Sequence, residues 1–192
     1  MKETLRLVLT PTIICLLAGA LLAGVDNLTK ERILNVNREK KLDALRQVLP
    51  AYDNQPDSNP CVIEHEGRTW TFYVALKAGA FAGAAVETSS PAGYGGDIIL
   101  MLGINAGGQT EAIAILGQKE TPGLGANIET DTFKDLFKQK SLSNTKWAVK
   151  KDAGDIDQIT AATISSRAVV DAVTTAVNAY LANTDAIQKT GL

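Results

Sequence analysis

The sequence has few of the side chains that bind metals. It contains one histidine, His65, and two cysteines, Cys15 and Cys61, which lie far apart in the chain. No cluster has the spacing of metal ligands, so we expect no zinc, haem or iron–sulfur site in this chain. Cys15 falls in an apolar segment and Cys61 follows Pro60 in a loop-like stretch, so a disulfide between them is not expected. The formal net charge is −2 and no basic patch stands out, which argues against nucleic-acid binding.

Charge is absent from the 19 residues of Leu7–Val25. As a helix this segment would span roughly 28 Å, about the thickness of the hydrocarbon core of a bilayer. Lys2 and Arg6 precede it and Asp26 follows it, which predicts a cytoplasmic amino terminus and an extracytoplasmic domain. The alternative is a cleaved signal peptide with a processing site at Ala18-Gly19-Ala20. The apolar run continues past that site, which favours a retained anchor.

The segment after the anchor is charged and favours a helix over Asp26–Leu49, which Pro50 would end. Residues 51–60 are rich in turn formers and predict a loop. The expected divisions of the chain are the cytoplasmic amino terminus and transmembrane anchor (1–25), a juxtamembrane helix (26–50) and an extracytoplasmic domain (51–192).

The pattern of the domain predicts strands first and helices later, which is typical of an α+β domain with a mainly antiparallel sheet and flanking helices. The segments with strand character are Thr69–Leu76, Phe81–Thr88, Asp97–Ile104, Thr110–Leu116 and Lys146–Lys150. Ser89–Gly96 is expected to be a loop, and Asn105–Gly108 a hairpin turn. Thr132–Lys140 is expected to be a short helix.

The stretch Asp157-Gln158-Ile159-Thr160-Ala161-Ala162-Thr163 reads as a loop that turns into a helix. Thr160 is the expected N-cap, and Thr163 then lies in the first turn, near unpaired backbone N–H groups that favour a phosphate. The following apolar residues recur at helical spacing and predict one buried face: Ile164, Ala168, Val169, Val173, Ala176, Val177 and Tyr180. From spacing alone, an ordinary capped helix with a Thr/Ser-rich start is the favoured explanation of this stretch.

The same stretch resembles the Asp-x-x-[Ser/Thr]-Gly-Ala-Thr signature at which a flavin transferase attaches FMN through a phosphoester. This resemblance implies that Thr163 carries covalent FMN and that Asp157 and Thr160 are recognised by the transferase. The sequence departs from the signature at Ala161, where the family usually has glycine.

Two glycine-rich strings, Gly93-Tyr94-Gly95-Gly96 and Glu120-Thr121-Pro122-Gly123-Leu124-Gly125, could each be simple turns. Together with the threonine motif and the anchor, they resemble the G subunit of Rnf-type ion-translocating oxidoreductase complexes. They also resemble its relative, the C subunit of the sodium-translocating NADH:quinone oxidoreductase. Gln118 stands where many Rnf relatives carry histidine. The resemblance implies flavin contacts by Thr160, Gly93, Tyr94, Gly95, Gly96, Glu120, Thr121, Gly123, Leu124 and Gly125.

The implied function is that of an anchored flavoprotein subunit that relays electrons in a complex coupling ferredoxin and NAD chemistry to sodium or proton transport. Its expected partners are the other subunits, membrane lipid and, during maturation, the flavin transferase. The flavin does the chemistry, so we expect no catalytic side chain and no activity of the chain alone. Two alternatives stay open: an anchored structural or ligand-binding module without a flavin, and a flavin carrier of a different membrane reductase.

Overall fold

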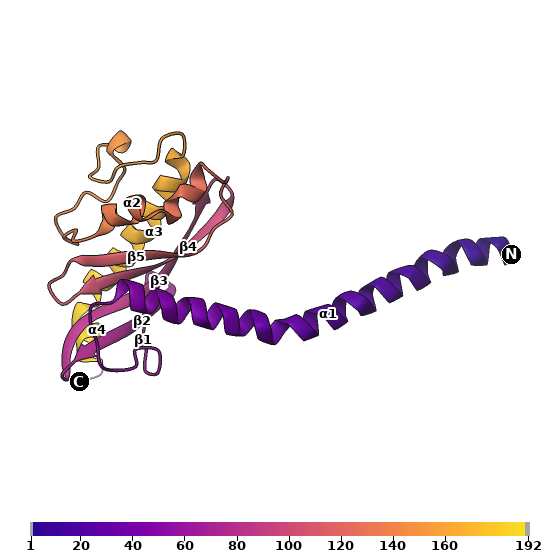
Figure 1. The fold of residues 1–192 in the computed structure, drawn as a ribbon, viewed down its shortest axis with the longest axis horizontal. Coiled ribbons are helices and arrows are strands. Elements are labelled where there is room, and N and C mark those ends of the chain that lie inside the picture. Colours follow the sequence, from indigo (N-terminus) through magenta and orange to yellow (C-terminus); the bar gives the residue numbers. More distant parts are fainter. Residues whose placement is uncertain (1, 191–192) are drawn as a thin grey trace. The chain divides into compact units, whose positions relative to one another are not determined.

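The computed structural model describes residues 2–190, apart from the side chains of residues 2–6 and 10. The chain divides into two units, one ending at Lys40 and a compact one beginning at Lys41 (Figure 1). The compact unit carries all of the strands.

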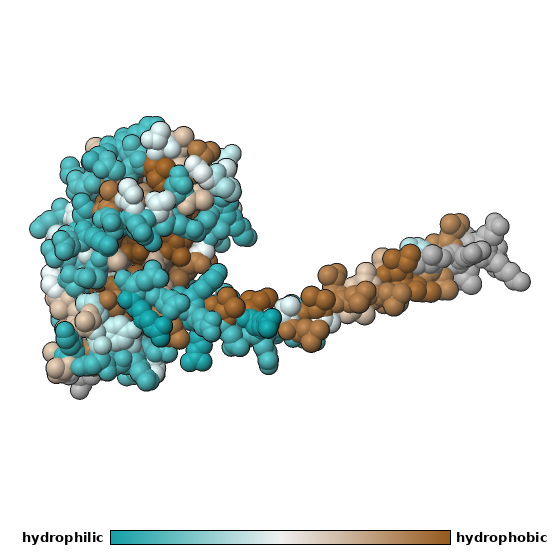
Figure 2. Space-filling model, in the orientation of Figure 1, coloured by the Kyte–Doolittle hydropathy of each residue, from teal (hydrophilic) through white to brown (hydrophobic). Residues whose placement is uncertain are grey.

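A single long helix, α1 (Lys2–Val48), contains both segments that the sequence assigned to helices. By length and composition it is the one helix among the described residues that is able to cross a membrane. The apolar side chains in the first part of this helix are exposed: Leu16, Leu21 and Leu22 are each at least 67% exposed. Figure 2 shows this part of α1 as predominantly hydrophobic. The helix ends just before Pro50, whose ring and missing N–H do not allow it to continue.

The predicted α+β class and antiparallel sheet are confirmed. Five strands pair with their neighbours in chain order, and every pairing is antiparallel. The strands are β1 (Cys61–His65), β2 (Arg68–Lys77), β3 (Ala80–Gly93), β4 (Gly96–Asn105) and β5 (Thr110–Gly117). The turn expected at Asn105–Gly108 joins β4 to β5.

Three predictions about the strands were wrong. Strand β1 was missed, because Pro60 and the short length of the segment made Cys61 look like part of a loop. Strand β3 continues through most of the expected loop Ser89–Gly96. Pro91 is accommodated there because the pairing with β4 is irregular between Ser90 and Gly93, so no ladder bond needs its missing N–H.

The third wrong prediction is the strand expected at Lys146–Lys150, which is absent from the sheet. Val149 makes only an isolated parallel bridge to Ile156. The chain reverses between them at Ala153, which has a left-handed φ of 61°. Gly154 then packs closely on the preceding segment, since a Cβ there would lie 2.0 Å from the carbonyl oxygen of Ala148.

One face of the sheet is covered by α3 (Thr163–Ala182), the helix that carries the threonine motif. The predicted apolar stripe is buried from Ala168 to Tyr180, whereas Ile164 is 48% exposed. Two polar side chains of β3 fix the helix along the strand. Thr88 donates to the carbonyl of Ala172 over 3.0 Å, and Ser90 donates to the Asp171 carboxylate over 2.7 Å.

The opposite face is covered by the last turns of α1 within the compact unit. Leu45 and Val48 pack there on small residues and on Met101. The approach is very close, because a Cβ on Gly103 would lie 1.8 Å from the carbonyl oxygen of Val48. Lys41 forms a salt bridge with Glu87 over 2.9 Å beside this contact.

Short helical segments occupy the remaining connections. They are η1 (Gly125–Glu129), α2 (Asp131–Lys134), η2 (Asp135–Phe137), η3 (Lys150–Asp152) and α4 (Thr184–Lys189). The helix expected over Thr132–Lys140 ends early, at Phe137, because the chain then pairs with β5. The Gln139 N–H donates to the carbonyl of Thr110, and the Thr110 N–H donates to the carbonyl of Lys140.

Candidate functional site

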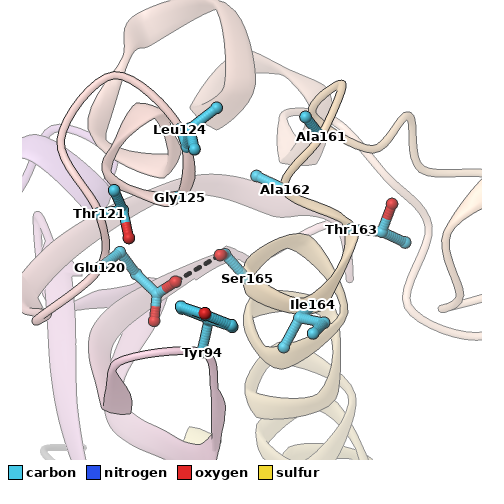
Figure 3. A pocket seen from close by; sticks show the side chains of 10 residues that line it. All are labelled: Tyr94, Glu120, Thr121, Leu124, Gly125, Ala161, Ala162, Thr163, Ile164 and Ser165. Carbon is cyan, nitrogen blue, oxygen red and sulfur yellow. Dashed lines mark hydrogen bonds between the residues drawn. The ribbon is translucent and has the colours of Figure 1, made fainter.

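A pocket of about 580 Å³ lies at the amino end of α3. Its walls come from the β3–β4 turn, the loop after β5 and the start of α3 (Figure 3). The lining residues are Tyr94, Glu120, Thr121, Leu124, Gly125, Ala161, Ala162, Thr163, Ile164 and Ser165. The volume is in the range that encloses a small molecule or part of a cofactor.

Glu120 joins the three walls of this pocket. Its side chain is only 6% exposed, and both of its oxygens accept hydrogen bonds. The Gly95 N–H donates to Oε1 over 2.8 Å, and the Ser165 hydroxyl donates to Oε2 (Figure 3). A buried carboxyl group without such partners would be strongly destabilising, so these bonds fix the turn, the loop and the helix against one another.

Glycines make this close arrangement possible. A Cβ on Gly95 would lie 1.9 Å from the carbonyl oxygen of Lys119, and one on Gly93 would lie 2.2 Å from that of Gly96. A Cβ on Gly125 would lie 2.4 Å from Glu120 Oε2 and 2.5 Å from Ser165 Oγ. The two glycine-rich strings therefore pack around one carboxyl group.

Large apolar side chains stand at the edge of the pocket. Tyr94 is 73% exposed, Leu124 44% and Ile164 48%, although all three line the cavity. They come from three different elements (Figure 3). An apolar rim around a buried polar group suits a flat ligand that has both apolar faces and hydrogen-bonding edges.

Helix α3 begins later than the expected cap implies. Its N-cap is Ala162, which has no side chain able to cap, so the prediction that Thr160 caps the helix was wrong. The cause is Ala161, whose φ of 62° puts a turn between Thr160 and the helix. Ser166 stabilises this turn instead, because its hydroxyl accepts from the Ile159 N–H over 3.0 Å.

Thr163 is the first residue of α3 and is half-buried. Two residues along an α-helix turn by about 200°, so the side chains of Thr163 and Ser165 leave opposite sides. Figure 3 shows Thr163 pointing away from Glu120 and Ser165. The N–H groups of the first helical turn lack acceptors within the helix, which makes this end suitable for an anion.

Ion pairs lie on the segment that precedes Thr163 and on the next turn of α3. Lys150 pairs with Asp157 over 2.8 Å. Arg167 donates to both oxygens of Asp152, with both distances 2.7 Å. The hydrogen bonds from Arg167 hold the pKa of the Asp152 carboxyl below its usual range, and Asp152 in turn raises the pKa of Arg167.

The structure brings together six of the residues that the sequence singled out, namely Tyr94, Glu120, Thr121, Leu124, Gly125 and Thr163. Gly93, Gly95 and Gly96 form the adjoining hairpin end, and Gly123 lies in the loop with a positive φ of 75°. Thr160 and Asp157 are exposed and do not line the pocket. Ser165 was not predicted as a site residue. Its position two residues after Thr163 places it on the opposite side of the helix, and this could have been read from the sequence.

Comparison with known proteins places this site in a family context. The family model described as FMN-binding domain matches residues 93–178, which include every residue that lines the pocket. The fold resembles the crystal structure of the C subunit of the Na(+)-translocating NADH-quinone reductase from Parabacteroides distasonis, with a TM-score of 0.58. The two chains are 17% identical, and the match covers 82% of this chain and 97% of that one.

Sequence relatives are more similar. The G subunit of the ion-translocating oxidoreductase complex of Stutzerimonas stutzeri is 40% identical over 167 residues, which cover 82% of this chain and 72% of that protein. The G subunit of the same type of complex in Pseudomonas aeruginosa strain PAO1 is 36% identical, covering 95% of this chain and 91% of that protein. On these similarities the chain belongs to the family of G subunits of ion-translocating oxidoreductase complexes.

Proposed function

We propose that this chain carries FMN esterified through its phosphate to Thr163, and that it relays electrons as an anchored component of an ion-translocating oxidoreductase complex. The observation that carries this proposal is the position of Thr163. It lies at the first residue of α3, beside a pocket whose lining belongs to an FMN-binding domain.

The residues at the pocket fit FMN in type and in arrangement. Tyr94, Leu124 and Ile164 offer apolar surface to a flat ring system. Glu120, held by Gly95 and Ser165, offers a fixed acceptor beside it. The free N–H groups of the first turn of α3 suit the phosphate.

FMN supplies reversible one- and two-electron chemistry when it is bound. The side chains of this chain would hold the ring, exclude water from one face of it and set the local charge. Glu120 acts as a positioning residue, because its hydrogen bonds maintain the relative positions of the three walls. The exposed rim leaves one side accessible to an electron donor or acceptor.

The helix α1 supports the proposed location. We propose that Leu7–Val25 spans the cytoplasmic membrane and that the domain lies on the extracytoplasmic side, because basic residues precede the apolar run. Its exposed apolar side chains would contact lipid and the other subunits of the complex. A covalent tether suits this location, since a free cofactor outside the membrane would be lost by dilution.

Formation of the ester would join the Thr163 oxygen to the FMN phosphorus of an activated flavin donor. The phosphoanhydride bond between that phosphorus and the leaving phosphate would break, and the leaving phosphate would depart with the proton of the hydroxyl. The test is to express the full-length chain with and without the flavin transferase and to measure the intact mass. We expect a gain of FMN less one water only with the transferase, a yellow protein after denaturation, and flavin on the peptide that contains Thr163. A protein that stays colourless and unmodified would favour a module without redox activity.

The partners need a separate experiment. Purification of the tagged chain from native membranes should recover the other subunits of an ion-translocating complex. Recovery of a different reductase, with flavin still attached, would retain the attachment site and overturn the assignment to this type of complex.

A further inference from the structure

We propose that Arg167 binds the phosphate of the flavin and fixes the tail of the cofactor on the side of α3 opposite Glu120. This inference rests on the proposed attachment at Thr163, and it adds a cofactor-binding residue that lies outside the pocket and outside the threonine motif.

The geometry of the helix puts the two residues on one face. Arg167 follows Thr163 by four positions, so the side chains lie on the same side about one turn apart. Side chains of a helix lean towards its amino end, which brings the guanidinium towards Thr163. Ser165, by contrast, leaves the opposite side and bonds Glu120.

Asp152 fixes the guanidinium without using all of its donors. The Nε–H and one Nη2–H are bonded to the two oxygens of Asp152. A guanidinium has five N–H donors, and the other three make no hydrogen bond to any of the atoms that the structure describes. A planar group held along one edge, with its other edge free, suits an oxyanion such as a phosphate.

Charge favours the same assignment. The segment before α3, residues 146–162, carries three lysines and three aspartates and is therefore neutral in total. Lys150 is already paired with Asp157, and Asp155 accepts from the Lys146 N–H. Arg167 adds one positive charge, which the single negative charge of a phosphodiester at Thr163 would neutralise.

The first turn of α3 supplies the remaining donors. Its unpaired N–H groups face the same anion from the helix end, so Arg167 would bind from the side and the backbone from the end. Arg167 is also exposed enough to be reached by a flavin that approaches from solvent: its side chain is 45% exposed.

The experiment compares FMN with riboflavin, which lacks the phosphate. The full-length chain, made without the transferase and held in detergent, is titrated with each flavin, and the dissociation constant is measured by flavin fluorescence. The variants are Arg167→Gln, Arg167→Lys and the control Lys138→Gln, which removes an exposed, ion-paired lysine elsewhere. We expect Arg167→Gln to weaken FMN about fivefold and riboflavin not at all, as for an exposed ion pair. Arg167→Lys should recover part of the loss.

Three outcomes would overturn the proposal: no preference of the unmodified chain for FMN over riboflavin, equal weakening of both flavins by Arg167→Gln, or the same loss of FMN in Lys138→Gln. A melting curve followed by circular dichroism shows whether each variant is folded. Covalent attachment is scored independently by intact mass, so a failure of the attachment at Thr163 is distinguishable from a failure of the role of Arg167.

Discussion

The two sides of the first turn of α3 differ in almost every physical property. On one side Ser165 bonds the buried Glu120, glycines pack around that carboxyl group, and apolar side chains surround the pocket. On the other side Thr163 is followed by Arg167, whose partner Asp152 is exposed. One helix start therefore separates an enclosed, largely apolar region from an open, charged one.

This difference would suit the two ends of the flavin whose attachment at Thr163 we propose. The ring needs an apolar surface with few, fixed polar groups, whereas the phosphate needs charge and donors and tolerates water. Because successive helical residues turn by about 100°, a three-residue stretch is sufficient to assign the two ends to opposite sides. The comparison predicts that substitutions on the two sides have separable effects.

The largest effect is expected from Thr163→Val. This change keeps the shape of the side chain and removes its oxygen, so covalent flavin should be lost completely while the pocket persists. The cost in the free energy of unfolding should be about 1 kcal/mol, as for an ordinary hydroxyl hydrogen bond. Mass spectrometry of the protein made with the transferase measures the loss. Thr175→Val, further along α3, is the matched control and should remain modified, because the Thr175 hydroxyl bonds only the carbonyl of Asp171 in its own helix. Flavin that survives denaturation in Thr163→Val would show that another residue is the attachment site.

Gly125→Ala should disrupt the packing around Glu120 and Ser165. The added methyl would lie 2.4 Å from Glu120 Oε2 and 2.5 Å from Ser165 Oγ, so the hydrogen bond between these residues must open. We expect a loss of about 2 kcal/mol in the free energy of unfolding, measured by urea denaturation. Gly117→Ala is the control, because the nearest atom to its Cβ is Ile99 Cδ1 at 3.8 Å. Equal stability of the two variants would show that the loop accommodates the methyl group without loss of stability.

Ala161→Gly should stabilise the turn that precedes α3. Ala161 has a φ of 62°, a conformation that costs an L-residue roughly 1 kcal/mol and glycine almost nothing. The substitution should therefore raise the free energy of unfolding by up to about 1 kcal/mol, visible as a higher melting temperature. Ala182→Gly, in the last turn of α3, should lower it instead. A fall in stability for Ala161→Gly would contradict the strain assigned to this turn.

The smallest effect concerns the charged side and its pH dependence. Because Arg167 lowers the pKa of Asp152, the folded state favours the ionised carboxyl group. The stabilisation by this pair is complete above the usual pKa of an aspartate, near 3.8, and is lost as the pH falls through the lower value of the folded protein. Asp152→Asn should thus be slightly less stable than the parent chain at about pH 6, and the two should converge once the pH falls below the lowered pKa of the Asp152 carboxyl group. Chemical denaturation across this range measures the difference, and a gap that persists at the acidic end would contradict the ion pair.

Much of the sheet could be predicted from the sequence, because β2, β4 and β5 are dense in β-branched and apolar residues and end at glycine turns. Strand β1 and the second half of β3 could not. Both contain or follow a proline, and only the pairing partner shows that its missing N–H is harmless.

The residues of the site likewise fall into those that could be predicted from the sequence and those that could not. The residues of the two glycine-rich strings and Thr163 were available from a resemblance to known motifs. The contact of Ser165 and the proposed role of Arg167 were not, because they depend on Glu120 and Asp152, which lie far away in the sequence or across a turn. The cap at Thr160 was wrong because a single left-handed residue, Ala161, delays the helix start, and propensity does not reveal that conformation.

The order of the strands has a consequence for folding. Each strand pairs with the next one in the chain, so the sheet is built from local hairpins, which close quickly. Helix α3 joins β3 only through contacts such as Ser90 to Asp171 and Thr88 to Ala172, which are 81 and 84 residues apart. In a chain made from its amino end, this docking is one of the late long-range events, followed by the packing of α4 on β2.

Thr163 and the rest of the pocket lining consequently come together only late in folding. A transferase that requires this arrangement would modify finished molecules and pass over incomplete ones.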